Sequence, residues 1–474
     1  MEEQQQEVIT RLQRAFRSRV TRPVQFRLAQ LEALHRLVAE SEDQIVAALH
    51  QDLGKPKFEA VLSDIEMVNN EIVFAINNLQ SWLQPEYVEK NLATKLDDCF
   101  VRREPLGVVL IIGAWNYPIQ VTLSPLVAAI AAGNCAILKP SEVSQATEKL
   151  LAKLIPKYLS QECYAVLCGG AEETKKLLEN QFDHIFYTGS QPVARSILQA
   201  AAVHLTPVTL ELGGKCPCLI YGNLDITAAA KRLAWSKFFN VGQSCVAPDY
   251  VLCTTQMRDD LLPALRDALE AFYTSEPQKS PDMGRIVTGR HWKRLIDMLK
   301  KSAGKVVIGG QSDEQERYIA PTVLVDVPED DVLMDGEIFG PILPILTIQT
   351  LEEGIDFMNR REKPLALYVF SDESKVVQTV LEHTSSGGFC SNDGIVHMAL
   401  QGLPFGGVGT SGMGSYHGRW GFETFSHRRG CMMRSWLLEP INVLRYPPYQ
   451  DRSLGWLRWA TTVRKKGWGS CTVM

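Results

Sequence analysis

No stretch of about 20 consecutive apolar residues, the length that spans a membrane as a helix, occurs in the sequence. The most apolar stretch, residues 107–140, is interrupted at Asn116, Pro118, Gln120 and Pro125. It reads better as a strand, a loop, a helix and a second strand. A basic excess is also missing, since the net charge is −5, and a surface that binds nucleic acid needs positive charge. These absences exclude a membrane-spanning helix and argue against nucleic acid as the main partner.

Cysteine spacing of the kind that forms a disulfide framework or a zinc site is lacking too. The eleven cysteines are scattered from Cys99 to Cys471. Cys216 and Cys218 form only a CxC pair, without a second pair at zinc-ligand spacing. The N-terminus, MEEQQQEVIT, lacks the basic and then apolar layout of a secretory signal. We therefore expect reduced cysteines in the cytosol and no metal site.

What the sequence does contain is a regular alternation of strand and helix signals, preceded by a helical segment at residues 5–50. Strands are predicted at 108–112, 135–140, 164–170, 184–190 and 207–214, and helices at 124–133, 145–159, 171–180 and 191–203. Ser124 and Pro125 are expected to start the first of these helices, and Gly133 to end it. This order favours a parallel sheet with helices on both faces and ligand sites at the carboxyl ends of its strands.

A second succession of strands and helices begins after Gly214, with a strand at 216–221 and a helix at 225–239, and continues to about residue 400. A glycine-rich segment, residues 403–414, is expected as a long loop. With 45% hydrophobic residues, a chain of 474 residues can bury a large core and divide into several structural units. The predicted class is α/β, with two such domains.

Three residues in these segments have side chains suited to acyl chemistry. Cys245, in NVGQSCVAPDY, follows a predicted helix and a Gly-Gln-Ser turn, where an exposed thiolate attacks carbonyl carbon, although free cysteines are more often packed in the core. Asn116, directly after a buried strand, either donates its amide to an oxyanion or is a turn residue. Glu211, in an apolar strand, either acts on water as a general base of raised pKa or forms a buried salt bridge, for example with Lys215.

Other polar residues at strand ends are candidates for binding a dinucleotide. Lys139 stands before a helix, where a lysine can hold ribose hydroxyls, and Gly189 and Ser190 stand at another strand-to-helix turn, where a helix N-terminus can bind a pyrophosphate. Glu337 and Phe339, in EIFGP, supply a carboxylate for ribose and a face for a flat ring, unless they are a strand end and a core residue. The usual GxGxxG dinucleotide motif is absent.

In their order and spacing, WNYP, LKPSE, YTGS, LELGGK, GQSC, EIFGP and PFGGVGTSGMG resemble the aldehyde dehydrogenase superfamily over nearly the whole chain. The short N-terminus, together with RYIAPTVLVDV, REKPLALYVFS and SSGGFCSNDG, resembles the class 3 enzymes, and most closely their prenylated B-type members. The resemblance implies a Rossmann-like NAD(P)-binding domain, an α/β catalytic domain and a small bridging element that makes a homodimer. The expected ranges are 1–82 with 104–210 for the NAD(P)-binding domain and 211–415 for the catalytic domain. The bridging element is expected at 83–103 with 416–445, and a C-terminal membrane-targeting tail at 446–474.

The resemblance also implies the reaction. Cys245 would add to an aldehyde to give a thiohemiacetal, whose oxyanion is held by the Asn116 amide and the Cys245 N–H. Hydride would leave to NAD+ or NADP+, and Glu211 would activate the water that hydrolyses the resulting thioester. The residues that would hold the cofactor are Lys139, Glu142, Gly189, Ser190, Glu337 and Phe339. Departures from the family pattern at Ala114, Ala194 and Cys216 remove no catalytic group.

The C-terminal sequence, RKKGWGSCTVM, places Cys471 in a CaaX prenylation signal, and a terminal methionine favours a farnesyl group, although the resembling enzymes include geranylgeranylated members. A single lipid chain binds membranes only marginally, so a second signal is needed. The basic residues 464–466 and the tryptophans Trp456, Trp459 and Trp468 would supply it, unless the tail is merely solvated. The prediction is attachment to the cytoplasmic face of a membrane, either the plasma membrane or a lipid droplet, with a cytosolic pool.

The first functional hypothesis is NAD(P)+-dependent oxidation of medium- and long-chain, lipid-derived aldehydes to carboxylic acids, in aldehyde detoxification or fatty aldehyde metabolism. A second hypothesis is a cysteine hydrolase in which His397 or His417 assists Cys245, with acyl transfer and no nicotinamide reduction. A third is an inactive, membrane-tethered scaffold on the same fold. The presence of every expected catalytic residue favours the first.

Overall fold

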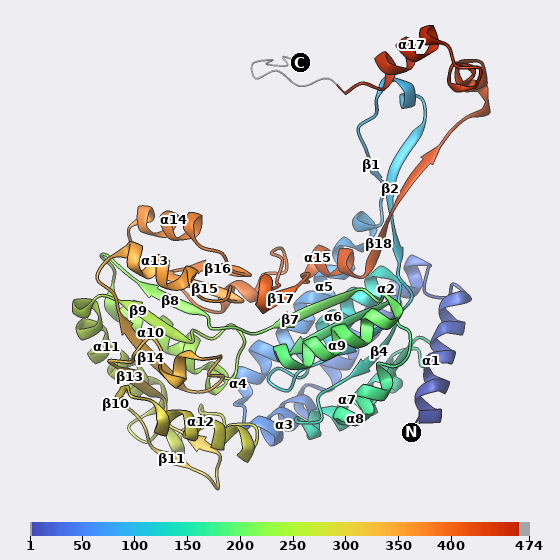
Figure 1. Ribbon diagram of the computed structural model, residues 1–474. Helices are drawn as coiled ribbons and strands as arrows, with labels where there is room; N and C mark the ends of the chain where they lie inside the picture. The colour runs from blue at the N-terminus through green and yellow to red at the C-terminus, as the bar shows by residue number, and fades with distance from the viewer. Residues whose placement is uncertain (1, 464–474) are drawn as a thin grey trace. The chain divides into compact units, whose positions relative to one another are not determined.

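The computed structural model describes residues 2–463, which form two compact units (Figure 1). Unit 1 comprises the chain up to residue 79 and residues 105–425, and unit 2 comprises residues 80–104 and the chain from residue 426. Unit 1 contains the segments predicted for both the cofactor-binding and the catalytic domain. The boundary predicted between those domains, at residue 210, stays a prediction.

The first sheet of unit 1 has six strands in the order β17-β7-β6-β3-β4-β5. Its strands are β3 (Val108–Ile112), β4 (Cys135–Lys139), β5 (Tyr164–Val166), β6 (His184–Gly189), β7 (Val208–Leu212) and β17 (Gly412–Met413). Strands β3 to β7 are parallel, and β17 pairs with β7 antiparallel. The five parallel strands are those that the sequence predicts, and their apolar runs are buried because helices cover both faces.

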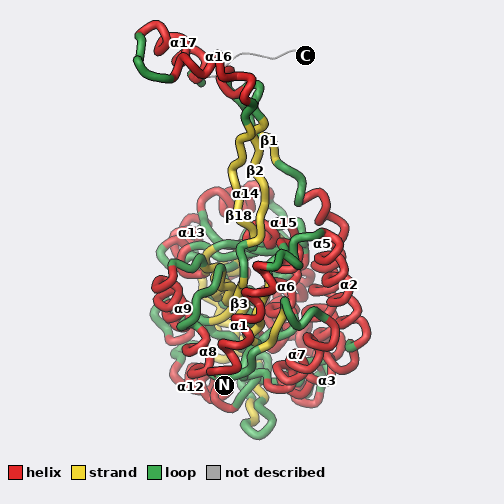
Figure 2. Tube along the Cα trace, turned by 90° about the vertical axis from the view of Figure 1, so that its right-hand side faces the viewer, coloured by secondary structure: helices red, strands yellow, loops and turns green. Residues whose placement is uncertain are grey.

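Helices pack on both faces of this sheet, as Figure 2 shows around β3. The connecting helices are α6 (Gln120–Ala132), α7 (Gln145–Tyr158), α8 (Ala171–Leu177) and α9 (Gln191–His204). The chain steps from β3 through β4 to β5 in one direction and from β6 to β7 in the other, and right-handed crossovers therefore put α6 and α7 opposite α9. The N-terminal helices add to both layers, because α2 (Val24–Glu40) packs on α6 and α7 while α1 (Glu2–Arg17) packs on β3 and β4.

The predicted N-terminal helical segment is confirmed. It comprises α1 (Glu2–Arg17), α2 (Val24–Glu40) and α3 (Glu42–Leu53), followed by α4 (Lys57–Ala60), the π-helical turn η1 (Val61–Ile65) and α5 (Glu66–Trp82).

The predicted start of α6 at Ser124 and Pro125 is wrong, because the helix begins at Gln120 and contains Pro125. The Asp64 carboxylate accepts hydrogen bonds of 3.2 Å from the N–H groups of both Ile119 and Gln120. The N-terminal cap is therefore supplied by a residue distant in sequence, and no local cap is needed. The predicted end at Gly133 is confirmed, with the glycine in the left-handed conformation.

The second sheet of unit 1 has seven strands in the order β10-β13-β14-β9-β8-β15-β16. The strands are β8 (Pro217–Ile220), β9 (Tyr250–Cys253), β10 (Lys305–Ile308), β13 (Thr322–Val325), β14 (Ile342–Thr347), β15 (Ala366–Phe370) and β16 (Gly388–Ser391). Only β10, at the edge, is antiparallel to its neighbour. The helices around it are α10 (Ile226–Phe238), α11 (Thr255–Tyr273), α12 (Gly289–Lys301), α13 (Leu351–Asn359) and α14 (Ser374–His383), with α15 (Gly418–Thr424) near the end of the unit.

Unit 2 is built on a three-stranded antiparallel sheet in the order β1-β2-β18. The strands are β1 (Glu86–Tyr87), β2 (Asp98–Pro105) and β18 (Ser426–Met433), and the helical turns are η2 (Leu92–Thr94), η8 (Trp436–Leu438), α16 (Glu439–Asn442), η9 (Val443–Arg445) and α17 (Asp451–Thr461). Among residues 2–463, no helix has the length and apolar character needed to cross a bilayer.

Candidate active site

Cys245 lies in the loop between α10 and β9, after a strained turn. Asn240 and Val241 have positive φ angles of 50° and 56°, which are unfavourable for residues with a side chain. Gly242 follows with φ of 70°, and a Cβ there would lie 2.3 Å from the Gly340 carbonyl oxygen. The Cys245 side chain is partly exposed while its neighbours on both sides are buried. The turn thus leaves Cys245 partly accessible within an otherwise buried loop.

Side chains from the second sheet hold the backbone that follows the thiol. The Cys216 thiol donates to the Cys245 carbonyl oxygen at 3.3 Å, and the Tyr368 hydroxyl donates to the Val246 carbonyl oxygen at 2.6 Å. The Asp249 N–H donates to the Cys216 carbonyl at 2.8 Å. Cys216, which departs from the family pattern, therefore contacts the loop through both its side chain and its backbone.

Asn116 contacts the same loop through both its side chain and its backbone carbonyl. Its side chain is buried, and its amide nitrogen donates to the Gln243 carbonyl oxygen at 3.2 Å, two residues before Cys245. An amide nitrogen carries two hydrogens, so one of them is left for another acceptor. The Asn116 carbonyl accepts from Lys55 at 3.1 Å and from the Asn240 amide at 3.0 Å. Asn116 is thus fixed to the turn that presents the thiol.

A buried ion pair holds Asn116 in place. Lys55 Nζ and Asp64 Oδ2 are 2.7 Å apart, and both side chains have 0% exposure. The same ammonium lies 4.3 Å from the centroid of the Tyr117 ring. Because Asp64 also caps α6, this pair fixes the segment WNYP at both of its ends.

Glu211 lies near the end of β7, opposite Thr188 of β6 and Gly412 of β17. The expected loop at residues 403–414 thus ends in a short strand that covers Glu211. Gly412 is required there, because a Cβ would come within 2.3 Å of the Leu210 carbonyl oxygen. The carboxyl is 3% exposed, and neither oxygen has a hydrogen-bond partner within the described residues. Burial raises its pKa well above the ordinary value.

The alternative interpretation of Glu211, a salt bridge with Lys215, is wrong. The Lys215 ammonium pairs with the Asp249 carboxylate and donates to the carbonyl oxygens of Leu333, at 2.6 Å, and Gly336, at 3.1 Å. All three of its N–H groups are therefore used elsewhere.

Electrostatics connect the thiol with two carboxyl groups. Burial raises the pKa of the Cys245 thiol, and the carboxylates of Glu337 and Glu211 raise it further. Burial also raises the pKa of Glu337 well above its ordinary value. Both carboxylates therefore lie within Coulombic range of the thiol, and each favours its neutral form.

A cavity of about 970 Å³ opens at the carboxyl ends of β3, β4 and β6. Four of the predicted cofactor residues line it, namely Lys139, Glu142, Gly189 and Ser190. Cys245, Asn116 and Glu211 are not among its lining residues. The structure thus brings these four cofactor candidates together and keeps them apart from the three catalytic candidates.

The cavity suits a nicotinamide dinucleotide. Lys139 and Glu142 form an ion pair of 2.8 Å that offers both a donor and an acceptor to hydroxyl groups. Helix α9 starts beside Gly189 without a side-chain cap, so its first N–H groups are open to an anion. A Cβ on Gly189 would lie 2.2 Å from the Tyr187 hydroxyl, so glycine is required at this turn.

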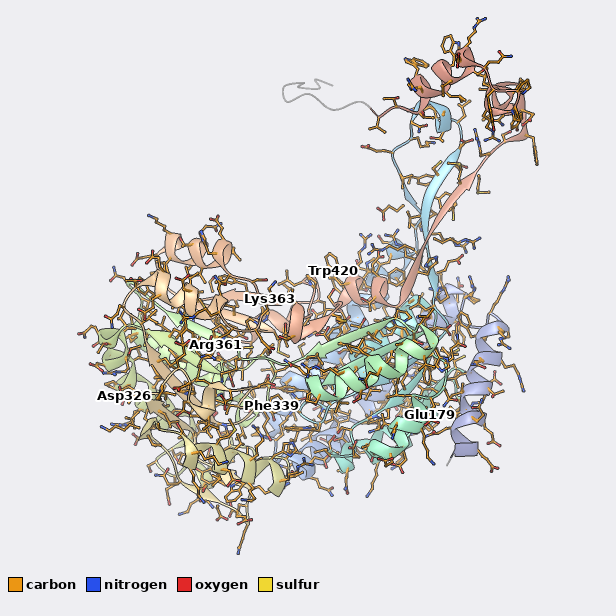
Figure 3. The ribbon with its side chains drawn as sticks, in the orientation of Figure 1. Glu179, Asp326, Phe339, Arg361, Lys363 and Trp420 are labelled. Carbon is orange, nitrogen blue, oxygen red and sulfur yellow. The ribbon has the colours of Figure 1, made fainter. Side chains whose placement is uncertain are left out.

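Neither Glu337 nor Phe339 lines the cavity, but Phe339 contacts a residue that does. The Phe339 ring, labelled in Figure 3, meets the Trp115 ring edge-on at 5.2 Å, and Trp115 meets His291 at 4.9 Å. Trp115 and His291 both line the cavity, together with Glu179, which is also labelled in Figure 3. Sequence reasoning missed both rings. Trp115 stands inside the motif GAWNYP, whereas no local signal marks His291.

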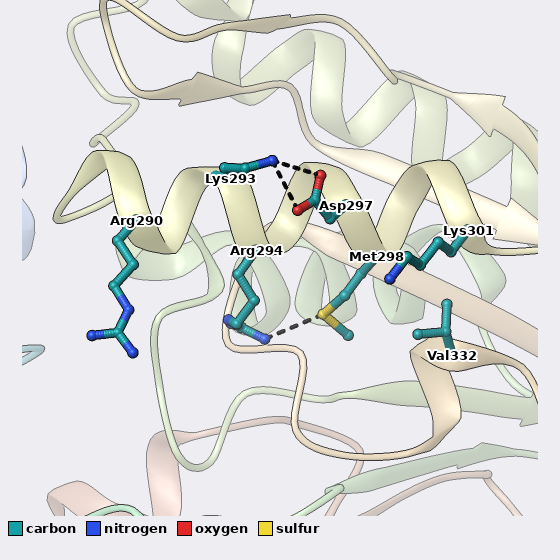
Figure 4. Close-up of a pocket in the computed structure, with 7 residues that line it drawn as sticks. All are labelled: Arg290, Lys293, Arg294, Asp297, Met298, Lys301 and Val332. Carbon is teal, nitrogen blue, oxygen red and sulfur yellow. Dashed lines mark hydrogen bonds and ion pairs between the residues drawn. The ribbon is translucent and has the colours of Figure 1, made fainter.

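A second cavity, of about 390 Å³, lies on the basic face of α12 (Figure 4). Lys293 pairs there with Asp297 at 3.1 Å, and Arg294 contacts the Met298 sulfur at 3.2 Å. Arg294 also donates to the Ile338 carbonyl at 2.5 Å, between Glu337 and Phe339. This helix face therefore supports the EIFGP segment.

The two histidines of the hydrolase hypothesis have other surroundings. His417 bonds through Nδ1 to the buried Glu71 carboxylate at 3.1 Å and stacks on Tyr416. His397 packs edge-on against Tyr368, and burial lowers its pKa to about 4. A base paired with Glu71, or one of such low pKa, is poorly placed to activate Cys245.

The fold and the large cavity define an oxidoreductase that uses a nicotinamide cofactor. A model of the aldehyde dehydrogenase family matches residues 1–430, and the chain belongs to this family. It oxidises aldehydes to carboxylic acids with NAD+ or NADP+. The resemblance that the sequence motifs predict is confirmed, and the hydrolase hypothesis is wrong.

Among curated proteins, the chain is similar to members of family 3. It is 56% identical to aldehyde dehydrogenase family 3 member B1 of Mus musculus over 446 residues, which are 94% of this chain and 95% of that protein. It is 55% identical to member B1 of Homo sapiens over 448 residues, with the same coverage. It is 53% identical to member B3 of Mus musculus over 469 residues, which are 99% of this chain and 96% of that protein.

Solved structures confirm the predicted fold. The substrate-bound state of Staphylococcus aureus AldH matches with a TM-score of 0.93 and 41% identity, over 96% of this chain and 98% of that one. An indole-3-acetaldehyde dehydrogenase complexed with NAD+ matches with a TM-score of 0.85 and 25% identity, over 92% and 89% of the two chains. Within residues 2–463, no cluster of histidine, cysteine and acidic residues that could hold a metal ion is found.

The buried ion pair leads to a prediction about stability. In Lys55→Met the Asp64 charge stays buried without its partner, so the free energy of unfolding should fall by about 3–5 kcal/mol. The exposed Lys57, whose nearest carboxylate is 3.9 Å away at Asp43, provides the matched control. Lys57→Met should change the free energy by less than about 1 kcal/mol. Urea unfolding of the full chain measures both, and equal midpoints for the two variants would contradict the role given to Lys55.

Proposed function

We propose that the enzyme oxidises medium- and long-chain, lipid-derived aldehydes at the cytoplasmic face of a membrane, through a thioester on Cys245. One observation carries the chemical part. A partly exposed thiol and an amide with an unused hydrogen lie at one loop, and a buried carboxyl without a partner is close enough to raise the pKa of that thiol. Acyl-thioester chemistry needs a nucleophile, an oxyanion donor and a base, and these three groups match that set.

In the first step the Cys245 sulfur attacks the aldehyde carbon. A carbon–sulfur bond forms, the thiol proton passes to solvent water, and the carbonyl electron pair moves onto oxygen. The free hydrogen of the Asn116 amide and the Cys245 N–H would stabilise the resulting oxyanion. The hydrogen bonds to Gln243 and Cys216 keep both donors in place, so little reorganisation is needed.

When bound, NAD+ or NADP+ accepts the hydride that leaves the tetrahedral carbon, and a thioester remains on Cys245. Lys139, Glu142, Gly189 and Ser190 would hold the cofactor in the cavity that they line, and Glu337 and Phe339 would hold it beside Trp115.

Glu211 would complete the reaction. Its ionised carboxylate takes a proton from water, the oxygen attacks the thioester carbon, and the carbon–sulfur bond breaks to release the carboxylic acid. The lack of hydrogen-bond partners leaves both oxygens of the carboxyl available to water. A raised pKa makes the ionised form a stronger base.

Substitutions separate the two chemical roles. Cys245→Ala should abolish formation of reduced nicotinamide, whereas Cys390→Ala, which removes another partly exposed thiol, should retain it.

Glu211→Gln should still give a burst of reduced nicotinamide, followed by turnover lowered about 10²–10⁴-fold. Because the Glu211 pKa is raised, the base is protonated at low pH, and wild-type deacylation should rise with pH through a value well above that of an ordinary glutamate. Wild-type rates in Cys245→Ala, or the same pH profile in Glu211→Gln, would contradict these roles.

The C-terminal part of the chain supports the substrate class and the location. Trp456 and Trp459 on α17 are each 55% exposed, as expected for residues that enter a membrane interface. Cys471, Trp468 and the basic residues 464–466 lie outside the described residues. A membrane-attached enzyme meets aldehydes that partition into lipid, so fatty aldehydes at the plasma membrane or a lipid droplet are the proposed substrates. We also propose a homodimer and a cytosolic pool.

Kinetics test the substrate class. The ratio kcat/KM for hexadecanal should exceed that for acetaldehyde by about tenfold or more, because each buried methylene contributes about 0.8 kcal/mol. Both aldehydes are delivered in the same detergent to the same enzyme preparation. A higher ratio for acetaldehyde would end the proposal of fatty substrates.

Labelling tests the lipid anchor. Radiolabelled farnesyl or geranylgeranyl should be incorporated into the wild type and not into Cys471→Ser. Cys168→Ser removes an exposed cysteine outside the motif and should label normally. Equal labelling of Cys471→Ser and wild type would show that Cys471 is not the acceptor.

A further inference from the structure

Glu59, on α4, carries a buried carboxyl group that the proposed reaction does not use. Its side chain accepts a hydrogen bond of 3.0 Å from the backbone N–H of Asn240, which lies 181 positions away in sequence. Asn240 is the first residue with positive φ in the turn that precedes Cys245. An acidic side chain from the N-terminal part of the chain therefore holds the turn that carries the proposed nucleophile.

This turn depends on contacts from other segments. Asn240 and Val241 both have left-handed backbone conformations, which persist in residues with a side chain only when the surrounding structure fixes them. At the other end of the turn, the Gln243 amide oxygen accepts from the Val287 N–H at 3.0 Å. That contact is between neutral groups, whereas the contact of Glu59 can gain or lose a charge with pH.

Asn240 links this support to both groups that are proposed to act on the aldehyde. Its side-chain amide donates to the carbonyl oxygens of Asn116, at 3.0 Å, and of Gln243, at 3.1 Å. The Gln243 carbonyl oxygen also accepts from the Asn116 side chain, and Gln243 lies two residues before Cys245. Movement of Asn240 would therefore displace the oxyanion donor and the nucleophile together.

The surroundings of Glu59 bring its ionisation close to neutral pH. Burial raises its pKa to about 7, against the opposing effect of the Lys55 ammonium and with a smaller contribution from the Asp282 carboxylate. Two tyrosines also lie within Coulombic range, Tyr117 before α6 and Tyr273 at the end of α11. Burial raises the pKa of both tyrosines, so they stay neutral while Glu59 titrates.

We infer that Glu59 is a positioning residue for the attack on the aldehyde, because its ionised carboxylate fixes the turn that aligns Cys245 with the Asn116 amide. The inference rests on the proposed roles of Cys245 and Asn116. The hydrogen bond from the Asn240 N–H favours the ionised form of Glu59, so by linkage the ionised form binds that N–H more strongly than the neutral form does. The turn is therefore held more firmly above neutral pH than below it.

The pH dependence of the first turnover tests this role. Glu59→Gln keeps an acceptor oxygen and the side-chain shape but removes the charge. Asp331→Asn is the matched control, because Asp331 is also buried and accepts hydrogen bonds from residues outside the turn, namely Ser302, Ala303 and Leu333. The burst of reduced nicotinamide is measured on the full chain with saturating cofactor, from below to above pH 7.

In the wild type and in Asp331→Asn, the burst rate should rise with pH through about 7, as Glu59 ionises. In Glu59→Gln this rise should be absent. The variant should match the wild type at low pH and be about tenfold slower at high pH, with KM for the aldehyde unchanged, because a charged acceptor forms the stronger hydrogen bond. The same rise in Glu59→Gln, or an equal loss of rate at every pH, would overturn the inference while the role of Cys245 stands. Wild-type rates in Cys245→Ala would end the proposed function and the inference together.

Hydrogen exchange tests the same link in the wild type alone, so the result does not depend on whether Glu59→Gln folds. After correction for intrinsic exchange rates, peptides that contain Asn240 should become about tenfold better protected as the pH rises through about 7. Peptides that contain Ala303, whose N–H is bonded to the Asp331 carboxylate at 2.7 Å, provide the reference and should show no such change. Unchanged protection of the peptides with Asn240 would contradict the role given to Glu59, whatever the activity of the enzyme.

Discussion

The buried ion pair between Lys55 and Asp64 is the interaction on which the site depends. Removing two charges from water is costly unless every remaining donor and acceptor is satisfied. Here Lys55 also bonds to the Asn116 carbonyl and contacts the Tyr117 ring, and Asp64 caps α6 through two N–H groups. The pair thereby fixes the N-terminal helices to the first sheet. Through Asn116 it also fixes the loop of the second sheet that carries Cys245.

Electrostatics place a second constraint on the same loop. Cys245, Glu211 and Glu337 all have raised pKa values, chiefly because burial disfavours their charged forms, and the two carboxylates add to the effect at Cys245. Burial therefore favours the neutral form of each group. A cationic group bound within reach of these groups would favour their ionised forms. Under the role proposed for Cys245, ionisation of its thiol would then depend on the positive charge of an oxidised nicotinamide cofactor.

The sequence predicts the parallel strands of the first sheet and the residues at their ends, because apolar runs and the turns between them are local signals. It does not predict the start of α6, because the cap comes from Asp64, or strand β17, because two residues carry no pattern and owe their conformation to pairing with β7. The sequence also could not decide between the two interpretations of Glu211, since the partners of Lys215 come from two segments distant in sequence. His291 reaches the cavity only through the packing of α12 beside Trp115.

The division of the chain into two units separates two kinds of recognition. In unit 1, polar contacts with fixed geometry orient the reacting groups, and an error of an ångström there would cost rate. In unit 2, the exposed Trp456 and Trp459 offer apolar surface without directional contacts, so an affinity at that surface would depend chiefly on buried area. A long-chain aldehyde combines both properties, since its carbonyl needs the first kind and its hydrocarbon chain partitions by the second. The proposed attachment to a lipid surface would raise the local concentration of such a substrate without changing the chemistry of the site.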